Sequence, residues 1–278
     1  MMNGDGINED TCKFAISGGN IEIIHLCEQK GFQFEDCLFI SSLFHRFDIF
    51  EWLNTHFEYE EIPLIKFIYC CNEPLFYAYS LSGSNVETKD KYGNTPINNA
   101  SKKGHLEVVK YLYETCHANV ETKDKYGYTP INWASYYGHL GVVKYLYETC
   151  HADIETKDNY GCTPINNASM NGHLDVAKYL YETCHANVEA KDNYGRTPIN
   201  NASINGHPEV VKYLYETCHA NVETKDEIGW TPINNASTNG HLEVVKYLYE
   251  TCHAEITDRA ICSATPNCRE YLKSIKVK

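Results

Sequence analysis

The sequence lacks any long uninterrupted apolar segment. Its most apolar stretch, residues 62–81, contains Lys66, Glu73 and Pro74, whereas a helix that crosses a bilayer needs about 20 consecutive apolar residues. The first ten residues are acidic, whereas an export signal starts with basic residues followed by an apolar run. We therefore expect packed core helices in this stretch, no association with a membrane and a cytoplasmic location.

Sequence patterns typical of catalytic sites are also missing. The chain has no phosphate-binding loop, no His-Glu-x-x-His and no Gly-x-Ser-x-Gly turn. It has no Cys-x-x-Cys pair, and its recurring Cys-His pair, first seen at Cys116, returns only every 34 residues. Such pairs lie too far apart in stacked helices to share a zinc ion. We expect no enzyme, no metal, no cofactor and no small-molecule substrate.

Cysteine and acidic residues, in contrast, are plentiful. The thirteen cysteines are odd in number and recur within a repeat, so we expect free thiols in a reducing compartment. The formal net charge of −13 repels phosphate groups. Nucleic acid and anionic membranes are therefore not expected as partners.

The dominant feature of the chain is an internal repeat. The motif Gly-x-Thr-Pro-Ile-Asn returns every 34 residues, beginning at residues 93, 127, 161, 195 and 229. A fixed period of this length indicates a stack of identical structural units.

Each unit reads as a turn followed by two short helices. In the first clear copy, Thr95 can cap a helix that begins at Pro96, where the missing N–H costs nothing. Gly104 ends this helix near residue 102, and a second helix follows over residues 106–115. Its buried stripe is expected to contain Val108, Val109 and Leu112. Helices this short need neighbours to persist.

This unit resembles the ankyrin repeat, whose signature is Thr-Pro-Leu-His-x-Ala. The resemblance implies an all-α ankyrin-repeat solenoid of helix-turn-helix units with projecting β-turn fingers. Two departures occur. Asn98 and its equivalents replace the histidine of the family, and the loop Cys116-His-Ala-Asn119 replaces Gly-Ala-Asp. Because the loop is one residue longer and has no glycine, we expect it to close differently.

Both ends of the chain also read as repeats. Residues 15–26 follow the pattern of residues 100–112, residues 41–53 fit more weakly, and residues 66–80 lie one period before the first clear repeat. The N-terminal region resembles a poorly characterised helical domain that precedes ankyrin arrays in some protist proteins. We expect degenerate helical repeats over residues 1–84, five regular repeats over residues 85–256 and a capping repeat over residues 257–278.

Differences among the five copies indicate where function lies. Variation gathers at the turn tips, after the glycine, and within and at the end of the first helix. The resemblance implies that these positions line a concave face that binds a protein partner, and Tyr, Trp and Arg suit such an interface. The predicted contact residues, centred on the second copy, are Lys91, Tyr92, Asn94, Lys102, Lys103, Tyr126, Tyr128, Trp133, Tyr136, Tyr137, Tyr160, Arg196 and Trp230.

Three function classes follow, of which the first two are the leading hypotheses. The first is an adaptor or scaffold that binds a protein of unknown identity in this groove. The second is a structural solenoid that self-associates weakly through an apolar N-terminal face, consisting of Phe39, Phe44, Phe47, Phe50, Trp52 and Phe67. An enzyme is the third, and Cys70 and Cys71 would be its residues to test. We expect Tyr111 and Tyr113 to form packing ladders rather than sites.

Overall fold

The computed structural model describes residues 9–32, 34, 37, 40, 41, 46, 48, 49, 52, 53 and 86–276. The chain divides into two compact units, residues 1–90 and residues 91–278. The expectations for residues 41–53 and 66–80 lie mostly or wholly outside the described residues, as do Cys70, Cys71 and the predicted N-terminal face except Trp52.

All regular structure in the described residues is helical, and no strand occurs there. The first unit contains α1 (Glu9–Gly18) and α2 (Ile21–Gln29). The helices of the second unit come in pairs: α7 (Pro96–Lys103) and α8 (Leu106–Glu114), α9 (Pro130–Tyr137) and α10 (Leu140–Glu148), α11 (Pro164–Met170) and α12 (Leu174–Glu182), α13 (Pro198–Asn205) and α14 (Pro208–Glu216), α15 (Pro232–Asn239) and α16 (Leu242–Glu250), and α17 (Asp258–Ser263) and α18 (Pro266–Lys276). The expected all-α solenoid is confirmed.

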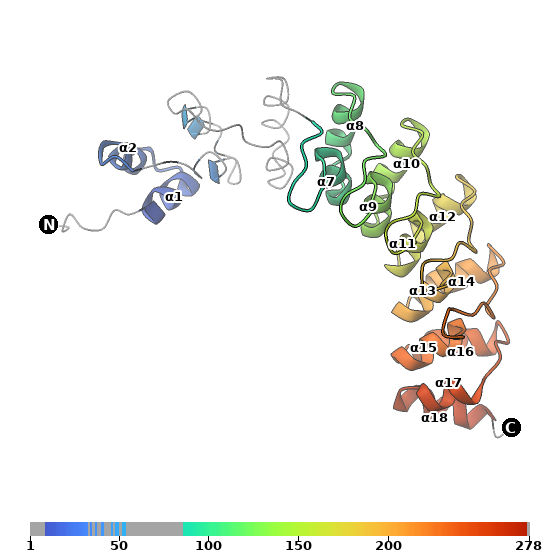
Figure 1. The fold of residues 1–278 in the computed structure, drawn as a ribbon. Helices are drawn as coiled ribbons and strands as arrows, with labels where there is room; N and C mark the ends of the chain where they lie inside the picture. The colour runs from blue at the N-terminus through green and yellow to red at the C-terminus, as the bar shows by residue number, and fades with distance from the viewer. Residues whose placement is uncertain are drawn as a thin grey trace. The chain divides into compact units, whose positions relative to one another are not determined.

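Within the second unit the pairs stack in one row (Figure 1). The first helices (α7, α9, α11, α13 and α15) pack on one another more closely than the second helices (α8, α10, α12, α14 and α16) do. This difference makes the side of the first helices the concave side of the row. Tight packing there needs small side chains, and Ala100 and its equivalents are fully buried at these contacts.

Each first helix begins and ends as its sequence requires. In the second copy, Thr129 is extended at the N-cap, Pro130 follows at the first helical position, and Thr129 and Asn132 form a capping box. Asn132 Oδ1 accepts the Thr129 backbone N–H at 3.2 Å and its hydroxyl at 2.7 Å. The helix ends at Gly138, whose φ of +77° is left-handed and therefore favours glycine.

The second helices bury the predicted apolar stripe. Val108, Val109 and Leu112 are at most 2% exposed, and burying each such side chain stabilises the fold by about 1.5–3 kcal/mol. The outer tyrosines form the expected ladder. Tyr113 packs edge-on against Tyr145 at 6.4 Å between ring centres, and Tyr145 donates a 2.8 Å hydrogen bond to Glu114.

Successive repeats are joined by polar groups that recur in register. Asn98 Nδ2 donates to the carbonyl of Thr122 in the next repeat at 3.0 Å, so the asparagine at the family's histidine position does form hydrogen bonds. His139 Nε2 lies 3.1 Å from the Lys102 carbonyl. Because a carbonyl only accepts, this nitrogen carries the proton. The repeats thus dock through fixed hydrogen bonds as well as apolar contact.

The loop after each second helix closes in its own way, as predicted. The histidines at this position, rather than a glycine, have positive φ values of 55–59°. They are His117, His151, His185, His219 and His253. The following alanine N–H bonds back to the helix, as in Ala118 N–H to the Leu112 carbonyl at 2.9 Å.

The two ends of the chain keep the helix-turn-helix plan. In the first unit, Gly19 turns with a φ of +74° and Asn20 caps α2 by accepting the Ile23 N–H at 3.1 Å. In the second unit, α17 and α18 cover α15 and α16 with buried Ile261, Cys268 and Leu272. The last pair therefore closes the apolar end of the stack.

Candidate functional site

An open groove runs across the fingers of the three middle repeats and the first helices α9 and α11. Here a finger is the turn between two repeats, such as residues 124–128. The groove has a volume of about 540 Å³. It is lined by Tyr126, Tyr128, Trp133, Tyr136, Tyr137, Tyr160, Cys162, Met170, Asp192, Tyr194 and Arg196.

Stacked aromatic rings form the floor of this groove at the second repeat. Tyr128 and Trp133 are only 7% and 8% exposed, and their rings stack with centres 4.3 Å apart. Trp133 also stacks on Tyr137 at 5.8 Å and meets Tyr136 edge-on at 5.9 Å. Each such pair contributes about 0.5–1.5 kcal/mol beyond its buried area, so the floor is rigid.

The finger aspartate explains why tryptophan fits inside this first helix. Asp124 Oδ1 accepts the backbone N–H groups of Tyr126 and Tyr128 at 2.8 and 2.9 Å. Its Oδ2 accepts the indole N–H of Trp133 at 3.2 Å. In the next repeat, Asn167 donates to the equivalent Asp158 at 3.4 Å. Trp133 therefore supplies an N–H donor to the finger aspartate, as the asparagine of the next repeat does, and adds an aromatic surface.

Exposed tyrosines form the mouth of the groove. Tyr126, Tyr160 and Tyr194 occupy the same position in three successive fingers and are 39%, 46% and 50% exposed. Backbone hydrogen bonds hold the fingers in line, since Asn159 N–H donates to the Tyr126 carbonyl at 2.9 Å. Tyr137, at the end of α9, also lines the groove and is 42% exposed. A partner can therefore contact rings that the fold already holds in place.

Burial shifts the ionisation of the groove's own groups towards their neutral forms. The pKa of the Tyr128 phenol is raised, first by burial and then by the nearby Asp158 charge. Burial likewise raises the pKa of the Cys162 thiol. A thiol in this state is a poor nucleophile, so the groove is suited to contact rather than to covalent chemistry.

Basic side chains lie over the aromatic rings. The Lys102 ammonium is 4.0 Å from the centre of the Trp133 ring, and Lys125 is 5.0 Å from the Tyr126 ring. The Arg196 guanidinium is 4.8 Å from the Tyr194 ring. Such cation–π contacts hold the charges at the rim of the groove.

Comparison with known families agrees with this architecture. A family model described as ankyrin repeats (3 copies) matches overlapping segments, namely residues 63–158, 118–192, 148–226 and 167–260. Together these segments cover more than half of the chain. The chain belongs to the ankyrin-repeat family. Ankyrin repeats are in general modules for protein–protein interaction and are typically not enzymes.

The N-terminal region of this ankyrin-repeat protein matches a second family model. This model, described as a domain of unknown function (DUF3447), covers residues 3–80. The match agrees with the expected distinct helical region before the repeats. A search of curated proteins found no match to the chain.

The ankyrin stack brings many of the predicted contact residues together. Those that line the groove are Tyr126, Tyr128, Trp133, Tyr136, Tyr137, Tyr160 and Arg196. Lys102 reaches the groove through Trp133, whereas Lys91, Tyr92 and Lys103 are exposed beside the first repeat and are not part of its lining. Asn94 is buried, and Trp230 is half-buried in the fifth repeat, also outside the lining.

Some residues of the lining were missing from the predicted set. Cys162, Met170 and Tyr194 occupy variable positions of the repeats, so the comparison of copies contained the signal for them. Asp192 belongs to the invariant turn of the repeat. Its place in the groove follows only from the stacking of one finger beside the next.

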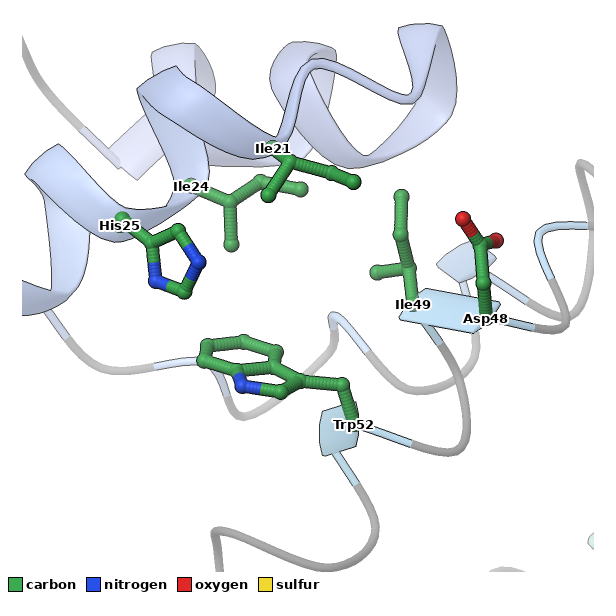
Figure 2. A pocket seen from close by; sticks show the side chains of 6 residues that line it. All are labelled: Ile21, Ile24, His25, Asp48, Ile49 and Trp52. Atoms are coloured by element: carbon green, nitrogen blue, oxygen red, sulfur yellow. The ribbon is translucent and has the colours of Figure 1, made fainter.

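A smaller apolar pocket lies in the N-terminal unit. Figure 2 shows Ile21, Ile24 and His25 of α2 facing Ile49 and Trp52 across it. The His25 ring meets Trp52 edge-on at 5.4 Å between centres. The pocket has a volume of about 130 Å³, which suits one side chain, whereas small-molecule sites occupy roughly 300–1,000 Å³.

No group of three or more His, Cys, Asp or Glu side chains that could hold a metal ion occurs in the described part of the chain. None of the helices in the described part has the length and apolar character needed to cross a membrane.

Proposed function

We propose that this chain is an adaptor or scaffold that binds a protein partner in the aromatic groove of its middle repeats. The observation that carries the proposal is the open groove of about 540 Å³ lined by aromatic side chains of three adjacent repeats. Tyrosine, tryptophan and arginine are the residues most enriched among binding hot spots. The groove combines all three.

The rigidity of the groove supports binding as well. Its floor is stacked, and hydrogen bonds between fingers hold the exposed rings of Tyr126, Tyr160 and Tyr194 in register. Binding to a preformed surface costs little ordering entropy, so most of the contact energy is available for affinity.

The first experiment compares affinity capture by two forms of the full chain. Tyr126→Ala/Tyr160→Ala/Tyr194→Ala removes exposed rings at the mouth and leaves the buried floor intact. A protein captured from lysate of the source cell by the wild type is expected to be depleted at least about tenfold with this variant, because hot-spot rings each contribute about 2 kcal/mol or more.

The matched control is Phe14→Ala/Ile228→Ala, which removes exposed apolar side chains outside the groove. It should capture the partner as the wild type does. Circular dichroism should show unchanged helix content for both variants. Equal capture by the wild type and the groove variant would contradict the proposal.

A second candidate function is self-association through the N-terminal unit. Phe14, Ile21 and Leu26 are 75%, 51% and 40% exposed on α1 and α2, and Ile21 also lines the apolar pocket of Figure 2. Under this candidate, light scattering would detect a dimer, and Phe14→Ala/Ile21→Ala would dissociate it while the groove variant would not.

A further inference from the structure

The variable positions of the repeats carry basic side chains although the whole chain has a formal net charge of −13. Lys102 and Lys103 end α7, whereas the equivalent residues of the later first helices are uncharged. Further basic side chains stand on the fingers, at Lys91, Lys125 and Arg196. Among these variable positions of the five described repeats, the only acidic residue is Glu227, on the fifth finger.

Two of these cations mark the two ends of the groove. Lys102 lies over the Trp133 ring and 5.8 Å from the Tyr137 ring, at the first-repeat end. Arg196 lines the fourth-repeat end, and its Nε is buried without a hydrogen-bond partner among the described residues. A guanidinium presents charge-assisted donors in a fork that matches a carboxylate, so a carboxylate of a partner can bind at this end.

Asp192 also lines the groove at the Arg196 end, but its own finger occupies its oxygens. Asp192 Oδ1 accepts the backbone N–H groups of Tyr194 and Arg196, both at 2.9 Å. Its Oδ2 accepts from Asn201 Nδ2 at 3.4 Å. Asp192 as a whole is 7% exposed, so the charge that a partner meets at this end is that of the arginine.

The middle of the groove between these cations is apolar. It presents the rings of Tyr137 and Tyr160 and the thioether of Met170, and no lysine or arginine other than Arg196 is in the described lining. Methionine beside aromatic rings adapts to bulky apolar side chains.

From this charge pattern we propose that the groove recognises an extended protein segment whose bulky apolar side chain is flanked on both sides by carboxylates. The inference rests on the proposed function and names the chemistry of its partner. The apolar side chain lies against Tyr137, Tyr160 and Met170, and the flanking carboxylates meet Lys102 and Arg196.

The acidic character of the whole chain does not cancel this local attraction. At physiological ionic strength the Debye length is about 8 Å, so distant carboxylates are largely screened. Charges in direct contact at a partly desolvated rim are screened much less. Lys102 and Arg196 therefore determine which charges bind.

A single-stranded nucleic acid also stacks on aromatic rings, but the pattern of charges disfavours it. Such proteins line the whole path of the backbone with positive charge, because phosphates recur at every nucleotide. Here Lys102 and Lys125 lie over rings at the first-repeat end and Arg196 lines the fourth-repeat end, where the buried Asp192 also lies. A short acidic segment fits this spacing and a polyanion does not.

The test is selection from a phage-displayed library of random dodecamer peptides on the full chain. Enriched peptides are expected to contain a bulky apolar residue with Asp or Glu on each side. The most enriched peptide, labelled with rhodamine, should then bind at least about tenfold more weakly to Lys102→Glu and to Arg196→Gln, since close charge pairs contribute about 1.5 kcal/mol or more.

The matched control is Lys144→Glu, on the second helix α10. It makes the same charge change in a lysine that also lies over a ring, that of Tyr179 at 5.4 Å, but away from the groove. Its affinity should equal that of the wild type. Equal weakening by Lys144→Glu would show a general field effect and overturn the inference.

Other outcomes separate this inference from the proposed function. Enriched peptides without acidic residues that still lose binding to Tyr137→Ala would overturn the charge pattern and leave the groove as the binding site. Enriched peptides that bind Tyr137→Ala normally, or no enrichment, would overturn the proposal that a peptide segment binds in the groove. If a twenty-nucleotide oligouridylate displaces the peptide, the groove binds nucleic acid, and the inference is also overturned.

Discussion

At the residue scale, histidine takes a backbone conformation that glycine usually supplies. His151 has a φ of +55°, and a left-handed residue other than glycine costs about 1–2 kcal/mol. Glycine removes that cost but loses about 0.5–1 kcal/mol through the entropy of the unfolded chain. We therefore expect His151→Gly to raise the free energy of unfolding by between 0 and about 1.5 kcal/mol, whereas β-branched His151→Val should lower it by about 1 kcal/mol or more, as measured by urea unfolding.

The comparison of these two variants contains its own control, because His151 is exposed and both changes remove the same imidazole. Any effect of losing the ring is common to both. Equal stability of the glycine and valine variants would show that the loop does not hold residue 151 in the left-handed conformation.

At the element scale, the turn between the two helices of a repeat depends on an uncharged histidine. Burial lowers the pKa of His139, His173 and His207 below the ordinary value, against a smaller opposing effect of the hydrogen bond to a carbonyl. Because the unfolded chain then binds protons more readily, this stabilisation is complete above about pH 6.5 and is lost as the pH falls below it. Stability should therefore decrease from pH 7 to pH 5.

The triple variant His139→Gln/His173→Gln/His207→Gln tests this link between packing and protonation. It should be less stable than the wild type at pH 7.5 and should lose less stability on acidification, as measured by urea unfolding at each pH. His219→Gln, which changes an exposed loop histidine, should retain the wild-type pH dependence. If the stability of the triple variant changes with pH as steeply as that of the wild type, other groups cause the pH dependence.

At the scale of the whole molecule, a repeat stack has no contacts between distant units, so stability is a sum over neighbours. Leu272 of α18 is fully buried, and Leu272→Ala should cost about 2–5 kcal/mol locally. Hydrogen exchange should show lost protection over α15–α18 and unchanged protection in α9 and α10. Glu270→Ala, on the exposed side of the same helix, is the control. Uniform loss along the stack would contradict additivity between neighbours.

Much of this architecture could be predicted from local sequence, because local groups decide it. Thr129 and Pro130 start a helix by capping, Gly138 ends it through a left-handed φ, and Val108, Val109 and Leu112 form a stripe by helical spacing. The site was harder to predict. Variation among the copies marks positions that tolerate substitution, but it does not show which of them are exposed. Tyr128 and Trp133 occupy variable positions and are nevertheless buried.

The sequence by itself determined the repeat, the helix ends and the apolar faces, because caps, turns and periodicity act within a few residues. Only the tertiary structure decided which rings meet. Tyr126, Tyr160 and Tyr194 are 34 residues apart in sequence and share one groove because hydrogen bonds align their fingers. Trp133 reaches Asp124 because the finger folds back on its own helix, and that contact places the aromatic floor.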